Sequence, residues 1–158
     1  ATVVVVVVVL LLVLFIGAIL AAIAIPNFLT AMQRAKQKRT MADLRSIAVA
    51  AEAYAVDHDA YPDVRSLDEL EAALSPTYIR QLPKVDGWDN PIEYDCWSTV
   101  EGAPCDSYVL LSGGRDAELE GKPLDAYAGP TTHFDCDIVF SNGHFVQYPG
   151  RGEATPER

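Results

Sequence analysis

The first 25 residues restrict this chain more than any other feature of its sequence. From Ala1 to Ile25 the apolar run is interrupted only by Thr2 and Gly17, and no ionisable side chain occurs before Arg34. As a helix, such a run rises roughly 38 Å, more than the ~30 Å hydrocarbon layer of a bilayer. A backbone in lipid must satisfy its hydrogen bonds internally. We therefore expect a helix that spans a membrane or lies in an apolar bundle.

A secretory signal peptide is the alternative for this segment, and it fits poorly. A signal peptide needs a basic start, a shorter apolar region and a cleavage site of small residues. The run Val3–Val9 also favours an apolar surrounding, because branching at Cβ makes valine a mediocre helix former in water.

Charge is divided unevenly along the chain. The 158 residues carry a net charge of −10, although 50% of them are hydrophobic. Residues 1–45 have a net charge of +4, which leaves −14 on residues 46–158. The charged residues of the first part are Arg34, Lys36, Lys38, Arg39, Asp43 and Arg45. This division excludes a simple soluble globule, and the acidic part argues against nucleic acid as a partner, because phosphate binding needs a basic surface.

The helical pattern continues past Pro26. Proline removes one helical hydrogen bond, so we expect a kink or a local opening there, with Gly17 as a second weak point. Further on, apolar residues recur at spacings of three and four, as in an amphipathic helix. They are Leu44, Ile47, Ala48, Ala51, Tyr54 and Ala55. The sequence predicts one long helix, apolar all round over residues 1–33 and amphipathic over residues 34–57.

Residues 58–150 predict an α+β head. Ser66 and Glu69 form a capping box that opens a short helix ending before Pro76. Four short segments rich in Tyr, Val, Ile and Phe predict strands, and Ser141-Asn142-Gly143 between the last two is a hairpin signal. The segments are Ile92–Trp97, Tyr108–Leu111, Ile138–Phe140 and His144–Tyr148. We expect a small antiparallel sheet packed on the second half of the long helix, and a flexible tail over residues 151–158.

All three cysteines lie in the head. Cys96 and Cys105 bracket a short loop that a disulfide could close, but pairing of either one with Cys136, or three reduced thiols, remains open. A disulfide implies an oxidising compartment. The basic cluster Arg34–Arg39 would instead place the head in the cytoplasm. A basic leader ahead of Ala1, removed later, would reconcile the two.

Several motifs carry a resemblance to a known family. The stretch Ile19–Phe28, followed by Tyr61-Pro62, resembles the N-terminal helix of the type IV pilin and type II secretion pseudopilin superfamily. Gly87–Pro91 resembles the Trp-Gly-Asn-Pro turn of the major pseudopilin. Tyr108–Asp116 together with Asp135–Ile138 resembles its calcium loop. The resemblance covers most of the chain and implies a pilin-like fold.

The resemblance also implies a calcium site. Its side-chain ligands would be Ser112, Asp116, Asp135 and Asp137, with backbone carbonyls near Leu110 completing the shell. Calcium accepts six to eight hard oxygens, and the long connection from 112 to 137 needs something to hold it. The alternative is that these acids merely face water on an acidic head.

One family feature is missing. The superfamily has a glutamate at its fifth mature position, which pairs with the N-terminal amine of a neighbouring subunit. Counting back from Pro26 gives Val9 at this place, and counting from Ala1 gives Val5. Apolar packing at about 25 cal/mol per Å² can supply most of the association energy without that ion pair.

The sequence offers little for catalysis. His58, His133 and His144 are scattered, and no phosphate loop or nucleophile motif occurs, so we expect no enzyme. The predicted function is a structural subunit of a type IV pilus-like or pseudopilus filament, a homo-oligomer built by bundling of the N-terminal helices. We expect the subunit in the inner membrane before assembly, filament assembly machinery as its partner, and then a periplasmic or cell-surface filament. The alternative is a single-span, membrane-anchored binding module that does not polymerise.

Overall fold

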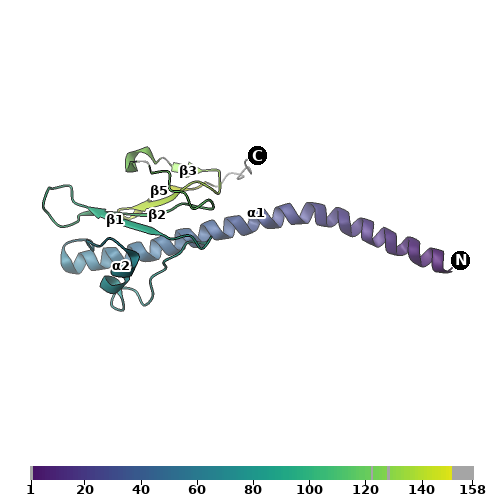
Figure 1. Ribbon diagram of the computed structural model, residues 1–158, viewed down its shortest axis with the longest axis horizontal. Coiled ribbons are helices and arrows are strands. Elements are labelled where there is room, and N and C mark those ends of the chain that lie inside the picture. The colour runs from purple at the N-terminus through teal and green to yellow at the C-terminus, as the bar shows by residue number, and fades with distance from the viewer. Residues whose placement is uncertain (1, 122, 128, 151–158) are drawn as a thin grey trace. The chain divides into compact units, whose positions relative to one another are not determined.

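A computed structural model describes residues 2–121, 123–127 and 129–150 (Figure 1). The predicted flexible tail, residues 151–158, lies outside the described residues. The elements, in chain order, are α1 (Thr2–His58), α2 (Leu67–Leu74), β1 (Glu93–Trp97), β2 (Ser107–Ser112), η1 (Leu124–Ala126), β3 (Gly129–Thr131), β4 (Ile138–Ser141) and β5 (His144–Pro149). The α+β arrangement of a long helix and a small sheet is confirmed.

The chain divides into two compact units, Ala1–Arg34 and Ala35–Arg158, and α1 contributes to both. In the first unit, every residue from 2 to 29 is exposed. Pro26 lies inside the helix, and the Thr30 hydroxyl donates a hydrogen bond to its carbonyl oxygen at 3.1 Å. By length and composition, α1 is able to cross a membrane.

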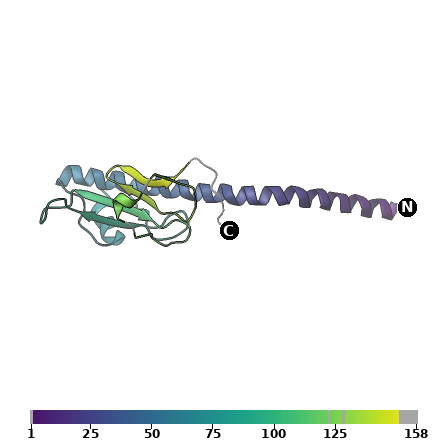
Figure 2. The same ribbon diagram turned by 90° about the horizontal axis from the view of Figure 1, so that it is seen from above.

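The second unit is built around the C-terminal part of α1. Leu44, Ile47, Ala48 and Ala51 are buried, which confirms the inward face of the predicted amphipathic stripe. They pack in one core with side chains from α2 and from the sheet. Those partners include Leu70, Leu74, Tyr94, Tyr108, Leu110, Ile138 and Phe140. Figures 1 and 2 both show the sheet alongside this part of the helix.

Helix α2 begins at the predicted cap. The Ser66 hydroxyl accepts a hydrogen bond from the Glu69 amide at 3.2 Å, as in a capping box. The Glu69 carboxylate accepts from the Arg65 amide at 3.0 Å, one residue earlier than the standard pattern. The helix ends at Leu74, ahead of Pro76, as the sequence predicts.

The sheet has five strands in the order β1-β2-β4-β5-β3. The four predicted strands are present and pair antiparallel to one another, and β4 and β5 are joined by the predicted turn, with φ of 46° at Asn142 and 86° at Gly143. The fifth strand, β3, pairs in parallel with β5. This strand is not predicted by the sequence, because the segment Gly129-Pro130-Thr131 shows no alternation of apolar and polar residues.

Candidate metal centre and assembly helix

The connection that follows β2 starts from a buried hydrogen-bond network. Ser112 and Asp86 are both fully buried, and the Ser112 hydroxyl donates to Asp86 Oδ2 at 2.7 Å. The other oxygen, Asp86 Oδ1, accepts from the amides of Trp88 at 2.8 Å and Asn90 at 2.9 Å. The two motifs of the resemblance, the Trp88 turn and the start of the long connection, are thus joined through one carboxylate.

Both ends of the long connection meet close to Gly114. The Arg115 amide donates to the Phe134 carbonyl at 3.0 Å, and the Asn90 side-chain amide donates to the Gly114 carbonyl at 2.8 Å. Gly114 has a φ of +66°, and a Cβ there would lie 2.8 Å from the carbonyl oxygens of both Phe134 and Cys136. Only glycine permits this backbone conformation and this close approach.

Two of the predicted ligands line one pocket. Asp116 and Asp135 contribute to a cavity of about 320 Å³. The Asp135 carboxylate is held by the Arg115 guanidinium through two hydrogen bonds of 2.6 Å, which raise the pKa of Arg115. Asp116 Oδ1 accepts from the Glu118 amide at 3.1 Å.

The remaining lining of this pocket is partly acidic. It consists of Glu118, Leu119, Glu120, His133 and Cys136. Glu118 and Glu120 are not among the predicted ligands, because the resemblance extends only to the acids of the loop motif. The sequence feature that indicates Glu118 and Glu120 is the closely spaced set of carboxylates from Asp116 to Glu120. Four carboxylates around one cavity give it the hard oxygen donors that calcium prefers.

Asp137 is the predicted ligand with the most informative surroundings. It is fully buried, and its Oδ2 accepts from the Glu120 amide at 3.0 Å and the Tyr127 hydroxyl at 2.9 Å. Its Oδ1 is also buried and has no hydrogen-bond partner among the described residues. Burial raises the pKa of the Asp137 carboxyl group, since desolvation disfavours the charged form. A buried carboxylate oxygen without a donor fits a site for a cation.

Leu110 lies deeper in the fold than the other predicted ligands. It is fully buried in β2, opposite Tyr94 of β1 and Phe140 of β4. Its side chain belongs to the hydrophobic core, so the backbone carbonyl is the only group that it can offer to a metal. The ligand set as a whole stays a prediction.

The cysteines form one disulfide. Cys96 in β1 is bonded to Cys105, just ahead of β2, with a Cα–Cα distance of 5.8 Å. This is one of the pairings that the sequence left open. Cys136 is a free thiol whose pKa is raised, mainly by burial. The low thiolate fraction that follows argues against a nucleophilic role for Cys136.

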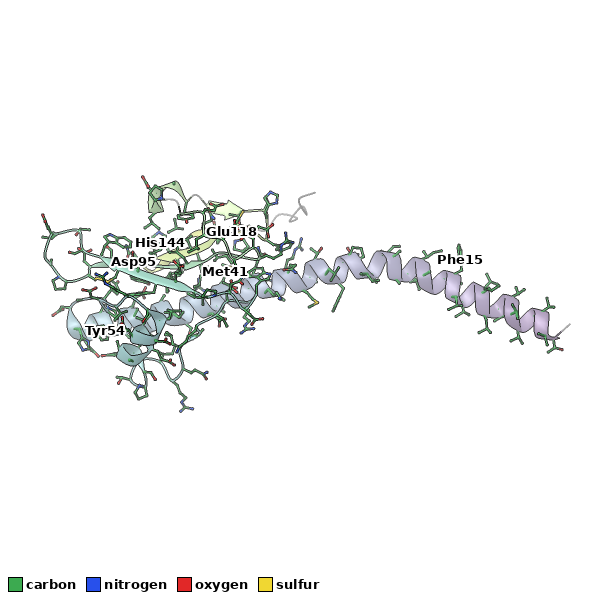
Figure 3. All side chains as sticks on the ribbon, in the orientation of Figure 1. Phe15, Met41, Tyr54, Asp95, Glu118 and His144 are labelled. Atoms are coloured by element: carbon green, nitrogen blue, oxygen red, sulfur yellow. A yellow bond between two sulfur atoms is a disulfide. The ribbon has the colours of Figure 1, made fainter. Side chains whose placement is uncertain are left out.

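The apolar segment of α1 presents its side chains outward. Phe15 is 65% exposed and Leu20 is 63% exposed, and Figure 3 shows Phe15 projecting from the helix. The exposed apolar surface of residues 2–29 is far larger than the apolar patches found on soluble monomers. Lipid or other apolar helices must cover it.

Comparison with known proteins identifies the family. The sequence model for type II secretion system (T2SS), protein G matches residues 27–131. The chain belongs to the type II secretion protein G family. Three relatives are each called type II secretion system core protein G. The protein from Pseudomonas aeruginosa is 33% identical over 130 residues, covering 74% of this chain and 86% of the relative. The Vibrio cholerae protein is 31% identical over 117 residues, covering 66% of this chain and 76% of the relative. The Pectobacterium carotovorum protein is 25% identical over 126 residues, covering 78% of this chain and 75% of the relative.

Membership in the protein G family confirms the resemblance to the major pseudopilin. The chain is therefore a structural subunit of a pseudopilus-type filament, and the alternative of a non-polymerising binding module is not favoured. The family match begins at Asn27. The role of the apolar stretch before it is therefore inferred from its apolar residues.

Proposed function

We propose that this chain builds a type II secretion pseudopilus by moving its apolar helix from the inner membrane into the core of a periplasmic filament. The observation that carries the proposal is the exposed apolar surface of α1 over residues 2–29 in a chain of the protein G family. Both surroundings, lipid and a bundle of like helices, keep this surface from water. Transfer between them therefore does not expose apolar area.

The charge distribution supports the same arrangement. No ionisable group interrupts residues 1–33, whereas residues 46–158 carry a net charge of −14. Charged groups are costly in an apolar core and stay in water. The acidic heads therefore lie on the filament surface. A contact between different faces of successive copies does not close on itself, and this geometry generates a helical polymer.

A charge in the apolar helix tests this function. Leu20→Asp places a carboxylate where lipid or neighbouring helices cover the chain, at a cost of about 2.5–3.5 kcal/mol in the middle of a membrane helix. We expect pseudopili to disappear from electron micrographs of cells that overproduce the variant together with the secretion machinery. Leu20→Met, which keeps an apolar side chain of similar volume, should assemble normally.

The Leu20 experiment needs a check on folding. The thermal unfolding midpoint of the second unit should be the same in both variants, because Leu20 lies outside the core formed around residues 44–51. Pseudopili of normal number and length from Leu20→Asp would contradict the proposed role of α1.

Calcium binding is the second part of the proposed function. Ser112, Asp116, Asp135 and Asp137 would hold the ion, together with a carbonyl near Leu110. The support is the buried Asp137 Oδ1 without a partner among the described residues, and the acidic pocket next to it. A bound cation would offset the charge of Asp137 and link the two ends of the connection.

Calcium titration tests this part. A ligand that binds only the folded chain at 100 times its Kd stabilises it by about 2.7 kcal/mol. We expect calcium to raise the unfolding midpoint of the full-length chain in detergent by several degrees, and magnesium to do so much less. Asp137→Asn should abolish the shift. Asp125→Asn, an exposed acid in η1, should retain it. An unchanged midpoint in the unmodified chain would refute calcium binding.

A further inference from the structure

Arg115 holds one of the predicted calcium ligands through both of its carboxylate oxygens. Its Nε and Nη2 groups donate to Asp135 Oδ1 and Oδ2, each at 2.6 Å. The planar fork of a guanidinium matches the geometry of a carboxylate and uses both oxygens at once. Asp135 also lines the acidic pocket, whereas Arg115 is not among the residues that line it. The Asp135 carboxylate is therefore shared by the guanidinium and the pocket.

Arg115 also joins the two ends of the long connection. Its amide donates to the Phe134 carbonyl at 3.0 Å, and its side chain binds Asp135, the next residue along the chain. The predicted calcium ligands belong to the same two ends. The positive charge of Arg115 thus makes the link between the ends that a bound cation would otherwise make.

Calcium and the guanidinium need the same oxygens. Calcium binds carboxylates through one or both oxygens at about 2.3–2.6 Å. Both oxygens of Asp135 accept hydrogen bonds from Arg115, so an ion bound there would lie close to a positive guanidinium, and like charges repel. The side chain of Arg115 is 44% exposed and that of Asp135 is 30% exposed. Ion pairs in contact with water contribute little to stability, so this pair opens at small cost.

We propose that Arg115 competes with calcium inside the chain: its guanidinium holds Asp135 in the calcium-free form and leaves this carboxylate when calcium binds. The proposal rests on the calcium part of the proposed function and adds a residue that sets the affinity. Arg115 then stabilises the calcium-free loop and weakens calcium binding, so its removal changes the two properties in opposite directions. If Arg115 instead oriented Asp135 for the ion, its removal would lower both stability and affinity.

Calorimetric titration of the full-length chain in detergent with calcium tests this competition. For Arg115→Gln, the calcium-free unfolding midpoint should fall by about 2 °C, the effect of an exposed ion pair. The Kd for calcium should fall by about fivefold, because that pair no longer has to be broken. Arg115→Lys, which keeps the charge but loses the fork, should have an intermediate Kd. Arg80→Gln, the same change of net charge at an exposed base after α2, should leave the Kd unchanged.

The titration separates the competition from calcium binding as such. A Kd for Arg115→Gln that equals or exceeds the Kd of the unmodified chain overturns the competition and leaves the calcium function standing. If neither chain binds calcium, the calcium part of the proposed function fails, and the competition fails with it. Should Arg115→Gln not fold, the Kd of Arg115→Lys decides in the same way.

Nuclear magnetic resonance measures the displacement of the guanidinium itself. The Nε–H signal of Arg115, assigned by its absence from Arg115→Gln, is protected from exchange with water while Nε donates to Asp135. Saturating calcium should increase the exchange rate of this proton by about tenfold or more, because the protecting hydrogen bond opens. An unchanged exchange rate in a chain that binds calcium would overturn the proposal.

Discussion

At the scale of single residues, Asp86 connects three parts of the second unit. It binds the Trp88 turn and Ser112 through its two oxygens. The next residue, Gly87, donates its amide to the Thr40 hydroxyl of α1 at 2.9 Å. A Cβ at Gly87 would lie 2.3 Å from the Lys36 carbonyl oxygen, so the turn sits directly against the helix backbone. This contact fixes the start of the candidate metal loop relative to α1.

Replacing Asp86 tests its structural role. Asp86→Asn keeps the shape but loses one acceptor oxygen, leaving the Ser112 hydroxyl or a turn amide poorly paired. We expect a loss of about 1.5–3 kcal/mol in the free energy of unfolding, as for hydrogen bonds to charged groups. Asp89→Asn, the same change at an exposed position of the same turn, should stay within about 0.5 kcal/mol of the unmodified chain. Equal stabilities of the two variants in urea unfolding would argue against the network.

The sequence predicts which residues belong to the candidate metal loop, but it does not predict which of their carboxylates are buried. The resemblance named the Trp88 turn and the loop acids, and local capping rules named Ser66 with Glu69. Neither source reveals whether a carboxylate is buried. The burial of Asp86 and Asp137 depends on contacts between segments that are far apart in the chain, and sequence spacing does not record them.

At the scale of elements, the hydrophobic periodicity predicted those parts whose burial follows a regular pattern. The α1 stripe and the four antiparallel strands were found because each presents a repeating apolar face to one core. β3 was missed since its pairing with β5 depends on the backbone of a segment that contains glycine and proline. Parallel pairing of so short a segment follows from the path of the long connection, not from its own residues.

The disulfide belongs to the β1–β2 hairpin and is open to a direct test. Closing so short a loop stabilises a chain by about 2–3 kcal/mol, mainly by restricting the unfolded state. A reducing agent should therefore lower the unfolding midpoint of the unmodified chain. The Cys136→Ser variant should show the same decrease. The double variant Cys96→Ser with Cys105→Ser should already have the lower midpoint and show no response, and a response from it would contradict the assignment.

At the scale of the whole molecule, the function follows from the division of charge and hydrophobicity along the chain. An uncharged apolar helix and an acidic folded unit need different surroundings, and a filament with a helical core and exposed heads provides both. The missing glutamate of the superfamily does not prevent this arrangement, since apolar packing can hold the helices together.

Image reconstruction of purified pseudopili made from this chain would show directly which part of the chain forms the filament core. We expect a core of parallel helices formed by residues 2–29 of successive copies, with the acidic units at the surface. A filament held together by contacts between the acidic units, with the apolar segment absent from its core, would contradict it.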